Sequence, residues 1–205
     1  MNVNRVREAE ALFLQQYPDG FADAELQTVR KRHNVDQLAA YAQEHLTPTL
    51  FEQPNAFAEV LVRIISRSSM VSRFEKPAFR QFIDSLNSSD RALLASAYQA
   101  RLTGRRKRQG FEQIVDMLAR HRIARWSIVS AVPFYFAPTR EVFVKPTTAK
   151  GIVRYLGASE LVYAPTPTFE FYEGYRRLIT DVKRMVVPSL GPNNAAITGF
   201  LMMSL

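Results

Sequence analysis

The spacing of apolar residues over the first 125 positions is the strongest constraint on the fold, because it repeats with the period of an α-helix. The clearest stripe, which follows Pro54 at a suitable first helical position, is Phe57, Val60, Leu61, Ile64 and Ile65. Similar spacing predicts helices over residues 4–16, 22–33, 35–46, 76–86, 93–102 and 111–118. Glycine disfavours helix interiors, and only Gly20 lies in the first 103 residues. The sequence therefore predicts a mainly α, multi-helical fold.

Proline becomes frequent after residue 126, since seven of the eleven prolines lie between Pro133 and Pro192. Proline fixes φ and lacks an N–H, so it divides regular structure into short pieces. We predict helices over residues 147–156, 169–186 and 193–205, and we expect residues 126–136 to be buried as either helix or strand. Residues 141–144 and 161–163 are strand candidates, so the C-terminal part contains at most a small two-stranded β patch.

This change in composition predicts a helical lobe over residues 1–125 and a proline-rich, mostly helical lobe over residues 126–205 packed on it. A chain of 205 residues is also short enough to form a single domain, and that alternative stays open. No apolar run approaches the ~20 residues that span a bilayer, and charged residues interrupt the first positions before a signal-peptide core can form. We therefore expect a soluble, cytoplasmic protein that does not bind membranes.

Residue types that are absent exclude several chemistries. The chain has no cysteine, which removes disulfides, iron–sulfur clusters and thiol nucleophiles. Its three histidines, His33, His45 and His121, are isolated from one another, and neither a phosphate-binding glycine loop nor a serine-hydrolase elbow occurs. We therefore expect no metal site, no cofactor and no catalytic residue, and the sequence favours a binding protein over an enzyme.

Positive charge is concentrated in one segment. The net charge of the whole chain is +8, and residues 101–125 contain eight Lys or Arg against two acidic residues. Clustered cations add their fields within a Debye length of about 8–10 Å, so this segment is a candidate for binding a polyanion such as nucleic acid. The candidate nucleic-acid-binding residues are Arg105, Arg106, Lys107 and Arg108. The alternative is a solvated connection between two helices.

A second group of residues has the chemistry of a small-anion site. Residues 63–76 combine serine hydroxyls with arginines near a helix end, and residues 141–150 place two lysines around a helix start. The candidate anion-binding residues are Arg67, Ser68, Ser69, Arg73, Lys145 and Lys150. They support an alternative function, an enzyme acting on a small anionic or phosphorylated substrate. The other interpretation of these residues is helix capping and surface charge.

The last predicted helix, residues 193–205, contains no charged side chain. A segment this apolar is normally docked in the core or buried against a second subunit. The protein is therefore expected to be a monomer or a homodimer, and a third candidate function is a helical scaffold with a protein partner.

Three segments also resemble an uncharacterised family of bacterial proteins. They are residues 66–77 (SRSSMVSRFEKP), 142–148 (VFVKPTT) and 193–203 (NNAAITGFLMM), and the resemblance spans most of the chain. It implies a bacterial cytoplasmic origin. The family has no established activity, so the resemblance supplies neither a substrate nor catalytic residues.

Overall fold

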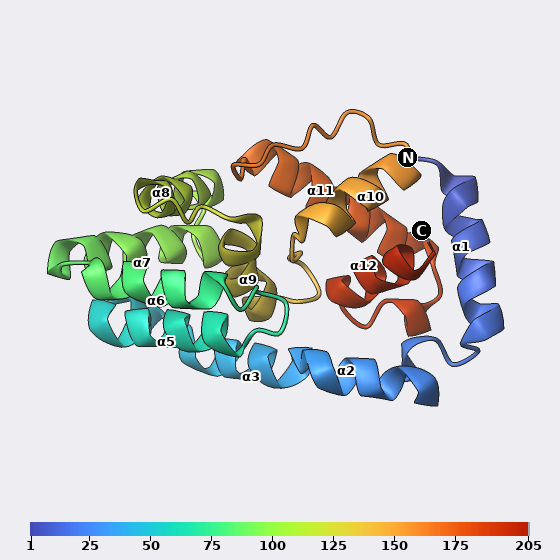
Figure 1. Cartoon of the computed structure of the whole chain (residues 1–205), viewed down its shortest axis with the longest axis horizontal. Helices are drawn as coiled ribbons and strands as arrows, with labels where there is room; N and C mark the ends of the chain where they lie inside the picture. Colours follow the sequence, from blue (N-terminus) through green and yellow to red (C-terminus); the bar gives the residue numbers. More distant parts are fainter. Residues whose placement is uncertain (205) are drawn as a thin grey trace.

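The computed structural model describes residues 1–204, with the side chains of residues 29, 30 and 32 outside the description. Within those residues every regular element is a helix and none is a strand, which confirms the mainly α fold (Figure 1). The α-helices are α1 (Val3–Gln16), α2 (Gln27–His33), α3 (Val35–His45), α4 (Pro48–Phe51), α5 (Pro54–Arg67), α6 (Glu75–Ser85), α7 (Ser88–Leu102), α8 (Lys107–Arg120), α9 (Trp126–Phe136), α10 (Pro146–Tyr155), α11 (Phe169–Met185) and α12 (Asn194–Met203). Three short 3₁₀ helices, Gly20–Ala22, Ala24–Leu26 and Pro188–Leu190, connect them.

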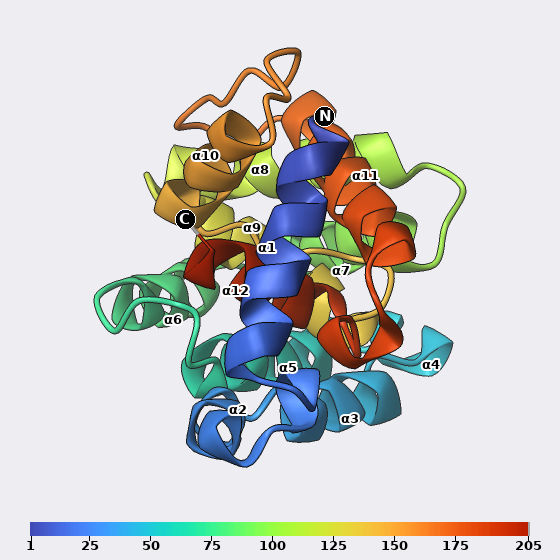
Figure 2. The same ribbon diagram turned by 90° about the vertical axis from the view of Figure 1, so that its right-hand side faces the viewer.

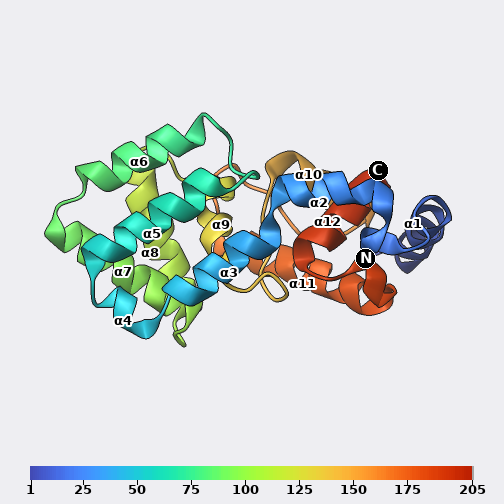
Figure 3. The ribbon, with the colours of Figure 1, turned by 90° about the horizontal axis from the view of Figure 1, so that it is seen from below.

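The helices form two packed groups that do not follow the order of the sequence. One group contains α3–α9 and the other contains α1, α2 and α10–α12, while α2 and α3 run in line along the lower edge of both (Figures 1 and 3). Helix α9 packs on α3 and α5, whereas α1 packs on α12. The grouping therefore differs from a division at residue 125, because α1 and α2 join the C-terminal group and α9 joins the N-terminal one. A continuous set of buried apolar residues connects both groups.

Neither strand candidate forms a strand. Within residues 141–144, Val142 N donates to Tyr172 Oη at 3.4 Å and Val144 N donates to Ser130 Oγ at 2.9 Å, while Glu141 N donates to the carbonyl of Ala137 in a turn. Around residue 161 the chain turns, with Leu161 N donating to the carbonyl of Ala158. The β patch is therefore corrected to irregular chain, because side chains and turns satisfy the amides that a sheet would have used.

An ion pair inside the core connects the two groups of helices. Arg101 on α7 donates from both terminal nitrogens to the carboxylate of Glu141, at 3.1 and 2.9 Å, and its side chain is only 1% exposed. Tyr172 on α11 donates its hydroxyl to the same carboxylate at 3.0 Å, and the Asn194 side chain on α12 donates to the Glu141 carbonyl. Arg101 is thus a structural residue in the core, although the sequence places it in the basic segment.

Helix α8 lies very close to α7 at one point. A Cβ built on Gly110 would stand 2.5 Å from the carbonyl oxygen of Ala97 and 2.6 Å from the backbone nitrogen of Arg101. Any side chain at this position would push the two helices apart. Gly110 therefore allows α8 to cover the helix turn that carries Arg101.

Helix α1 crosses the outside of the C-terminal group, in front of α10, α11 and α12 (Figure 2). Arg5 donates to the carbonyl of Tyr155, and the Val187 N–H donates to the carboxylate of Glu10 at 2.7 Å. The Phe13 ring packs edge-on against Phe200 of α12, with centroids 5.5 Å apart. Helix α12 is thus docked within this chain, and its inward-facing residues are fully buried.

Candidate functional site

The six candidate anion-binding residues do not form a single cluster. Ser68 is buried, where its Oγ contacts the Tyr135 hydroxyl at 2.9 Å and accepts the backbone N–H groups of Met70 and Val71. Its hydroxyl therefore shapes the turn after α5. Arg73 lies over the ring of the neighbouring Phe74 at 4.8 Å.

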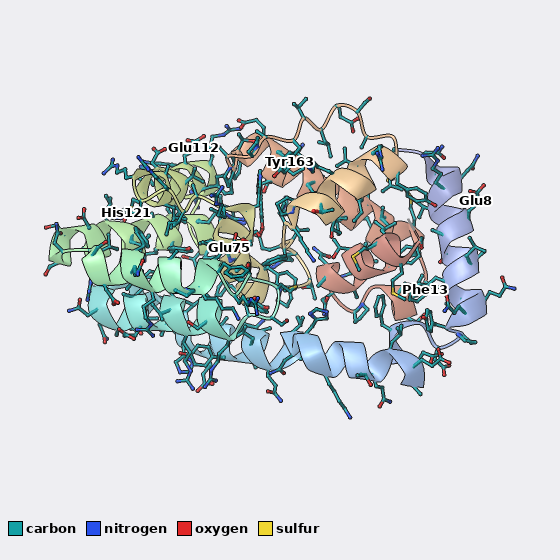
Figure 4. All side chains as sticks on the ribbon, in the orientation of Figure 1. Glu8, Phe13, Glu75, Glu112, His121 and Tyr163 are labelled. Atoms are coloured by element: carbon teal, nitrogen blue, oxygen red, sulfur yellow. The ribbon has the colours of Figure 1, made fainter. Side chains whose placement is uncertain are left out.

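Two more of the six candidates lie on separate surfaces. The Lys150 amine is 5.3 Å from the centroid of Tyr163, which Figure 4 labels beside α10 and α11. Arg67 lines a groove on the outer face of α5, where Arg63 and Arg80 join it. Only Ser69 and Lys145, which are 76 positions apart in the sequence, come together in one cavity.

That cavity lies between the two groups of helices and has a volume of about 330 Å³. Its walls come from residues 21–36, the turn after α5, residues 143–148 around the start of α10, and residues 192–203, which include most of α12. Most of the lining is apolar, and the larger apolar side chains are Phe21, Leu26, Val35, Met70, Phe143, Met202 and Met203. A volume of this size falls within the range of small-molecule sites in proteins, about 300–1,000 Å³.

A few polar groups interrupt the apolar wall. Lys145 is the single lysine or arginine among the described lining residues, and its exposed side chain forms no hydrogen bond or ion pair with any described residue. Ser69 Oγ lies 3.1 Å from His33 Nδ1 and 3.3 Å from the His33 carbonyl oxygen. Asp36, in the first turn of α3, supplies the carboxylate of the lining. The cavity therefore offers one amine, one carboxylate and a histidine–serine contact around an apolar body.

Local sequence explains how Lys145 is positioned. It occupies the N-cap of α10, and Pro146 follows at the first helical position, where its fixed φ favours a helix start. The Lys145 side chain makes no capping bond, so the N–H groups of the first turn, including that of Thr148, have no partner from the cap. An anion near Lys145 would meet both the amine and these amides.

Gly199 controls the width of the cavity on the α12 side. A Cβ at this position would approach only the Phe21 ring, at 3.5 and 3.8 Å, which is ordinary van der Waals contact. The helix thus tolerates an alanine here, whereas a longer side chain would extend into the space that Gly199 lines. Gly199, Phe143 and Met202 were missed by sequence reasoning, since nothing in a local pattern shows that α12 meets the segment before α10.

The basic segment is divided by the fold. Arg101 is buried, and Arg108 pairs with Glu112 and Glu170. Arg105, Arg106 and Lys107 are exposed at one end of α8, without a carboxylate within 4.0 Å in the described part of the chain. Of the remaining arginines, Arg120 is the last residue of this 14-residue helix, roughly 20 Å from its start, and Arg122 and Arg125 follow it. Figure 4 labels Glu112 on this helix and His121 directly after its last residue. The eight cations therefore do not form one charged surface.

No three histidine, aspartate or glutamate side chains of the described residues gather closely enough to hold a metal ion. Among the helices of residues 1–204, none combines the length and apolar character needed to cross a membrane. The chain matches no protein-family model, no curated protein and no solved structure at a significant level. The resemblance to an uncharacterised bacterial family therefore stays a prediction, and the site must be interpreted from its own geometry.

Proposed function

We propose that the protein binds a small organic molecule with an apolar body and one anionic group in the cavity between the two groups of helices. The observation that carries this proposal is the unpaired amine of Lys145 at the wall of an otherwise largely apolar cavity of about 330 Å³. A carboxylate or phosphate group next to Lys145 gains a charged hydrogen bond, which is about twice as strong as a neutral one.

The apolar lining determines the chemistry of the uncharged part of the ligand. Burial of each CH₂ group of a ligand is worth about 0.8 kcal/mol, so a chain or ring of several carbons binds with useful affinity. Met202 and Met203 are 49% and 45% exposed, and methionine side chains adapt to irregular ligand shapes. The carboxylate of Asp36 repels a second anionic group, which favours a ligand with its charge at one end.

An enzyme would have to use the contact between Ser69 and His33. A serine nucleophile needs a histidine nitrogen that accepts its proton, and Ser69 Oγ has two acceptors within reach, His33 Nδ1 at 3.1 Å and the His33 carbonyl at 3.3 Å. Because the carbonyl competes for the same proton, the geometry favours binding over acyl transfer. A Ser69→Ala variant that binds the ligand with unchanged affinity supports a binding function. Release of a chemically altered ligand by the parent, but not by this variant, would instead support an enzyme.

The proposal can be tested with octanoate, and with octanol and octylamine as probes of the same length. Octanoate at a hundred times its Kd stabilises the folded state by about 2.7 kcal/mol, which raises the Tm by roughly 5–10 °C. Octanol should give a smaller shift and octylamine the smallest. A Lys145→Ala variant should lower the octanoate shift to that of octanol. Calorimetric titration of the three probes into the parent, and of octanoate into Lys145→Ala, checks that each Tm shift reports binding.

Gly199 provides a matched pair of variants for the same test. Gly199→Leu should fill the cavity and remove binding of octanoate and octanol alike, whereas Gly199→Ala should bind both as the parent does. The proposal fails if octanoate gives no saturable signal, or if the leucine variant binds it as tightly as the alanine variant.

A second candidate function is polyanion binding by Arg105, Arg106 and Lys107. The observation in its favour is that these three neighbouring cations are exposed and have no carboxylate within 4.0 Å in the described part of the chain. Three phosphate contacts would give only a shallow salt dependence, so this surface supports weak, sequence-independent binding. Its test forms the last prediction of the Discussion.

A further inference from the structure

A groove on the outer surface gathers arginines from two different helices. It has a volume of about 380 Å³ and runs along α5, which lies between α3 and α6 (Figure 3). Buried Val60 and Val62 are part of its lining, and the arginines of the lining are Arg63, Arg67 and Arg80. None of these residues lines the cavity that Lys145 and Ser69 share, so the two sites are separate.

Arg63 is oriented in an unusual way. Glu59 lies four residues before it on the same helix, which is the favourable order for an ion pair of about 0.2–0.5 kcal/mol. The pair nevertheless does not form, since no carboxylate oxygen of Glu59 lies within 4.0 Å of a guanidinium nitrogen of Arg63. Arg63 instead places its guanidinium over the ring of Tyr41, 4.7 Å from the centroid. Tyr41 is itself stacked on His45, with centroids 4.0 Å apart.

This stack holds Arg63 in place before any ligand binds. One face of its guanidinium is covered by Tyr41, and its N–H groups, which point outward in the plane of the guanidinium, have no acceptor among the described residues. An arginine fixed in this way loses less side-chain freedom on binding, and its planar group suits two parallel bonds to a phosphate or carboxylate.

The neighbouring arginines cannot all be explained by helix stability. Arg67 is in the last turn of α5, where a cation is favoured by the helix dipole. Arg63 and Arg67 are four positions apart, however, and like charges at this spacing destabilise a helix. Arg80 comes from the middle of α6, so no helix end accounts for its presence in the same groove. Three arginines thus line one groove in which Glu59 is the one acid of the lining, and this excess of positive charge favours an anionic partner.

We propose that this groove binds a single phosphoryl group, carried by a phosphate monoester or by inorganic phosphate. The three arginines supply enough positive charge and N–H donors to bind a dianion, and Ser66 adds a hydroxyl. Glu59 limits the ligand to one phosphoryl group, because its carboxylate repels the next phosphate of a continuous polyanion. The site is additional to the proposed cavity ligand, and the proposal does not depend on that ligand.

The first experiment measures binding of inorganic phosphate, and of phenyl phosphate as a monoester, by calorimetry and by the NMR shifts of arginine Nε–H groups at constant ionic strength. Saturable binding with shifts at Arg63, Arg67 and Arg80 is expected. An Arg63→Gln, Arg80→Gln double variant should bind at least about tenfold more weakly. The control is Arg154→Gln, Arg177→Gln, which removes the same charge from another part of the chain and should bind as the parent does. Equal weakening in both double variants, or the absence of saturable binding in the parent, would overturn the proposal.

A variant that should bind phosphate more tightly than the parent provides a second, independent test. Glu59→Gln removes the opposing charge without removing a proposed phosphate contact, so phosphate should bind several-fold more tightly. A 5′-phosphorylated oligonucleotide should bind the parent more tightly than the same oligonucleotide without its terminal phosphate. If Glu59→Gln leaves phosphate affinity unchanged, or if the two oligonucleotides bind equally, the groove does not select a single phosphoryl group.

Discussion

Arginines in two regions of this protein have opposite environments. Arg101 is enclosed between α7, α8 and α11, where Glu141 satisfies its terminal nitrogens and the ring of Tyr172 lies 4.9 Å away. Arg63 and Arg80, in the surface groove, are exposed and have no carboxylate partner among the described residues. The comparison shows that the same residue type serves the fold in one region and remains available to a ligand in the other. Removing each should therefore have different consequences.

The largest effect is expected for Arg101→Ala. This change leaves the Glu141 carboxylate buried without its partner, and such a loss costs about 3–5 kcal/mol. For a domain of this size the Tm should fall by roughly 6–20 °C. Arg80→Ala is the matched surface variant and should change the stability by less than about 0.5 kcal/mol. Thermal and urea unfolding of both variants measures the difference, and equal losses would remove the contrast between the two regions.

The next largest effect concerns the glycine that covers Arg101. Gly110→Ala places a methyl group within 2.6 Å of the Arg101 backbone nitrogen, so α8 must move and the stability should fall by about 1–3 kcal/mol. Gly199→Ala is the control, because its methyl group has room and alanine favours a helix by about 0.5–1 kcal/mol. The two glycine-to-alanine changes are therefore predicted to have opposite signs in urea unfolding. A stable Gly110→Ala variant would show that α7 and α8 separate at little cost.

A third effect depends on pH. Burial alone would raise the pKa of Glu141, but the hydrogen bonds and charge of Arg101, together with the Tyr172 hydroxyl, outweigh it and hold this pKa below the usual value. A carboxyl whose pKa is lowered by folding stabilises the protein above its unfolded pKa of about 4.3, and this contribution disappears as the pH falls through the folded value. Stability should therefore drop below about pH 4.5 in the parent, and the drop should be smaller in Glu141→Gln. Unfolding at a series of pH values tests this, and identical profiles would exclude Glu141 as a source of the acid sensitivity.

The smallest effect is expected in the exposed basic loop. Replacement of Arg105, Arg106 and Lys107 by serine should leave the stability within about 0.5 kcal/mol, since none of the three is paired with a carboxylate in the described part of the chain. If the loop binds nucleic acid, the plot of log K against log salt should lose up to about 2.7 units of slope for duplex DNA. Binding that survives the replacement with the same slope would place the polyanion elsewhere on the surface.

Much of the helical fold could be predicted because its signals are local. Pro54 begins α5 as the sequence predicts, and the predicted helix from residue 169 is α11, which the side chain of Thr168 caps by accepting from Phe171 N. Other boundaries depend on tertiary packing. Helix α8 begins at Lys107 and contains Gly110 in its interior, because the close approach to α7 compensates for the low helix propensity of glycine. Helix α7 likewise begins five residues before the predicted stretch of residues 93–102, at Ser88, because the side chain of Asn87 caps it by accepting from Asp90 N.

The apolar segment before Pro138 illustrates a second limit. Residues 126–136 form α9 with Pro133 inside it, and burial on all sides removes the alternating pattern that separates helix from strand. For the candidate site, the chemistry of Ser69 and Lys145 was recognised from residue type and position. Their convergence, and the separation of Arg67, Arg73 and Lys150, depends on how distant helices pack, which no local pattern encodes.

The position of α1 also determines the order in which the molecule can assemble during synthesis. Arg5 bonds to a carbonyl 150 positions later, and Glu10 bonds to an amide 177 positions later. An isolated 14-residue helix is only marginally stable in water, so α1 remains unfolded until the C-terminal helices have left the ribosome. The helices from α3 to α9 pack mainly on one another, and all of them precede α10–α12 in the sequence, so they can form their core earlier. A nascent chain arrested before α12 should therefore carry a folded centre and an α1 segment that proteases still cleave.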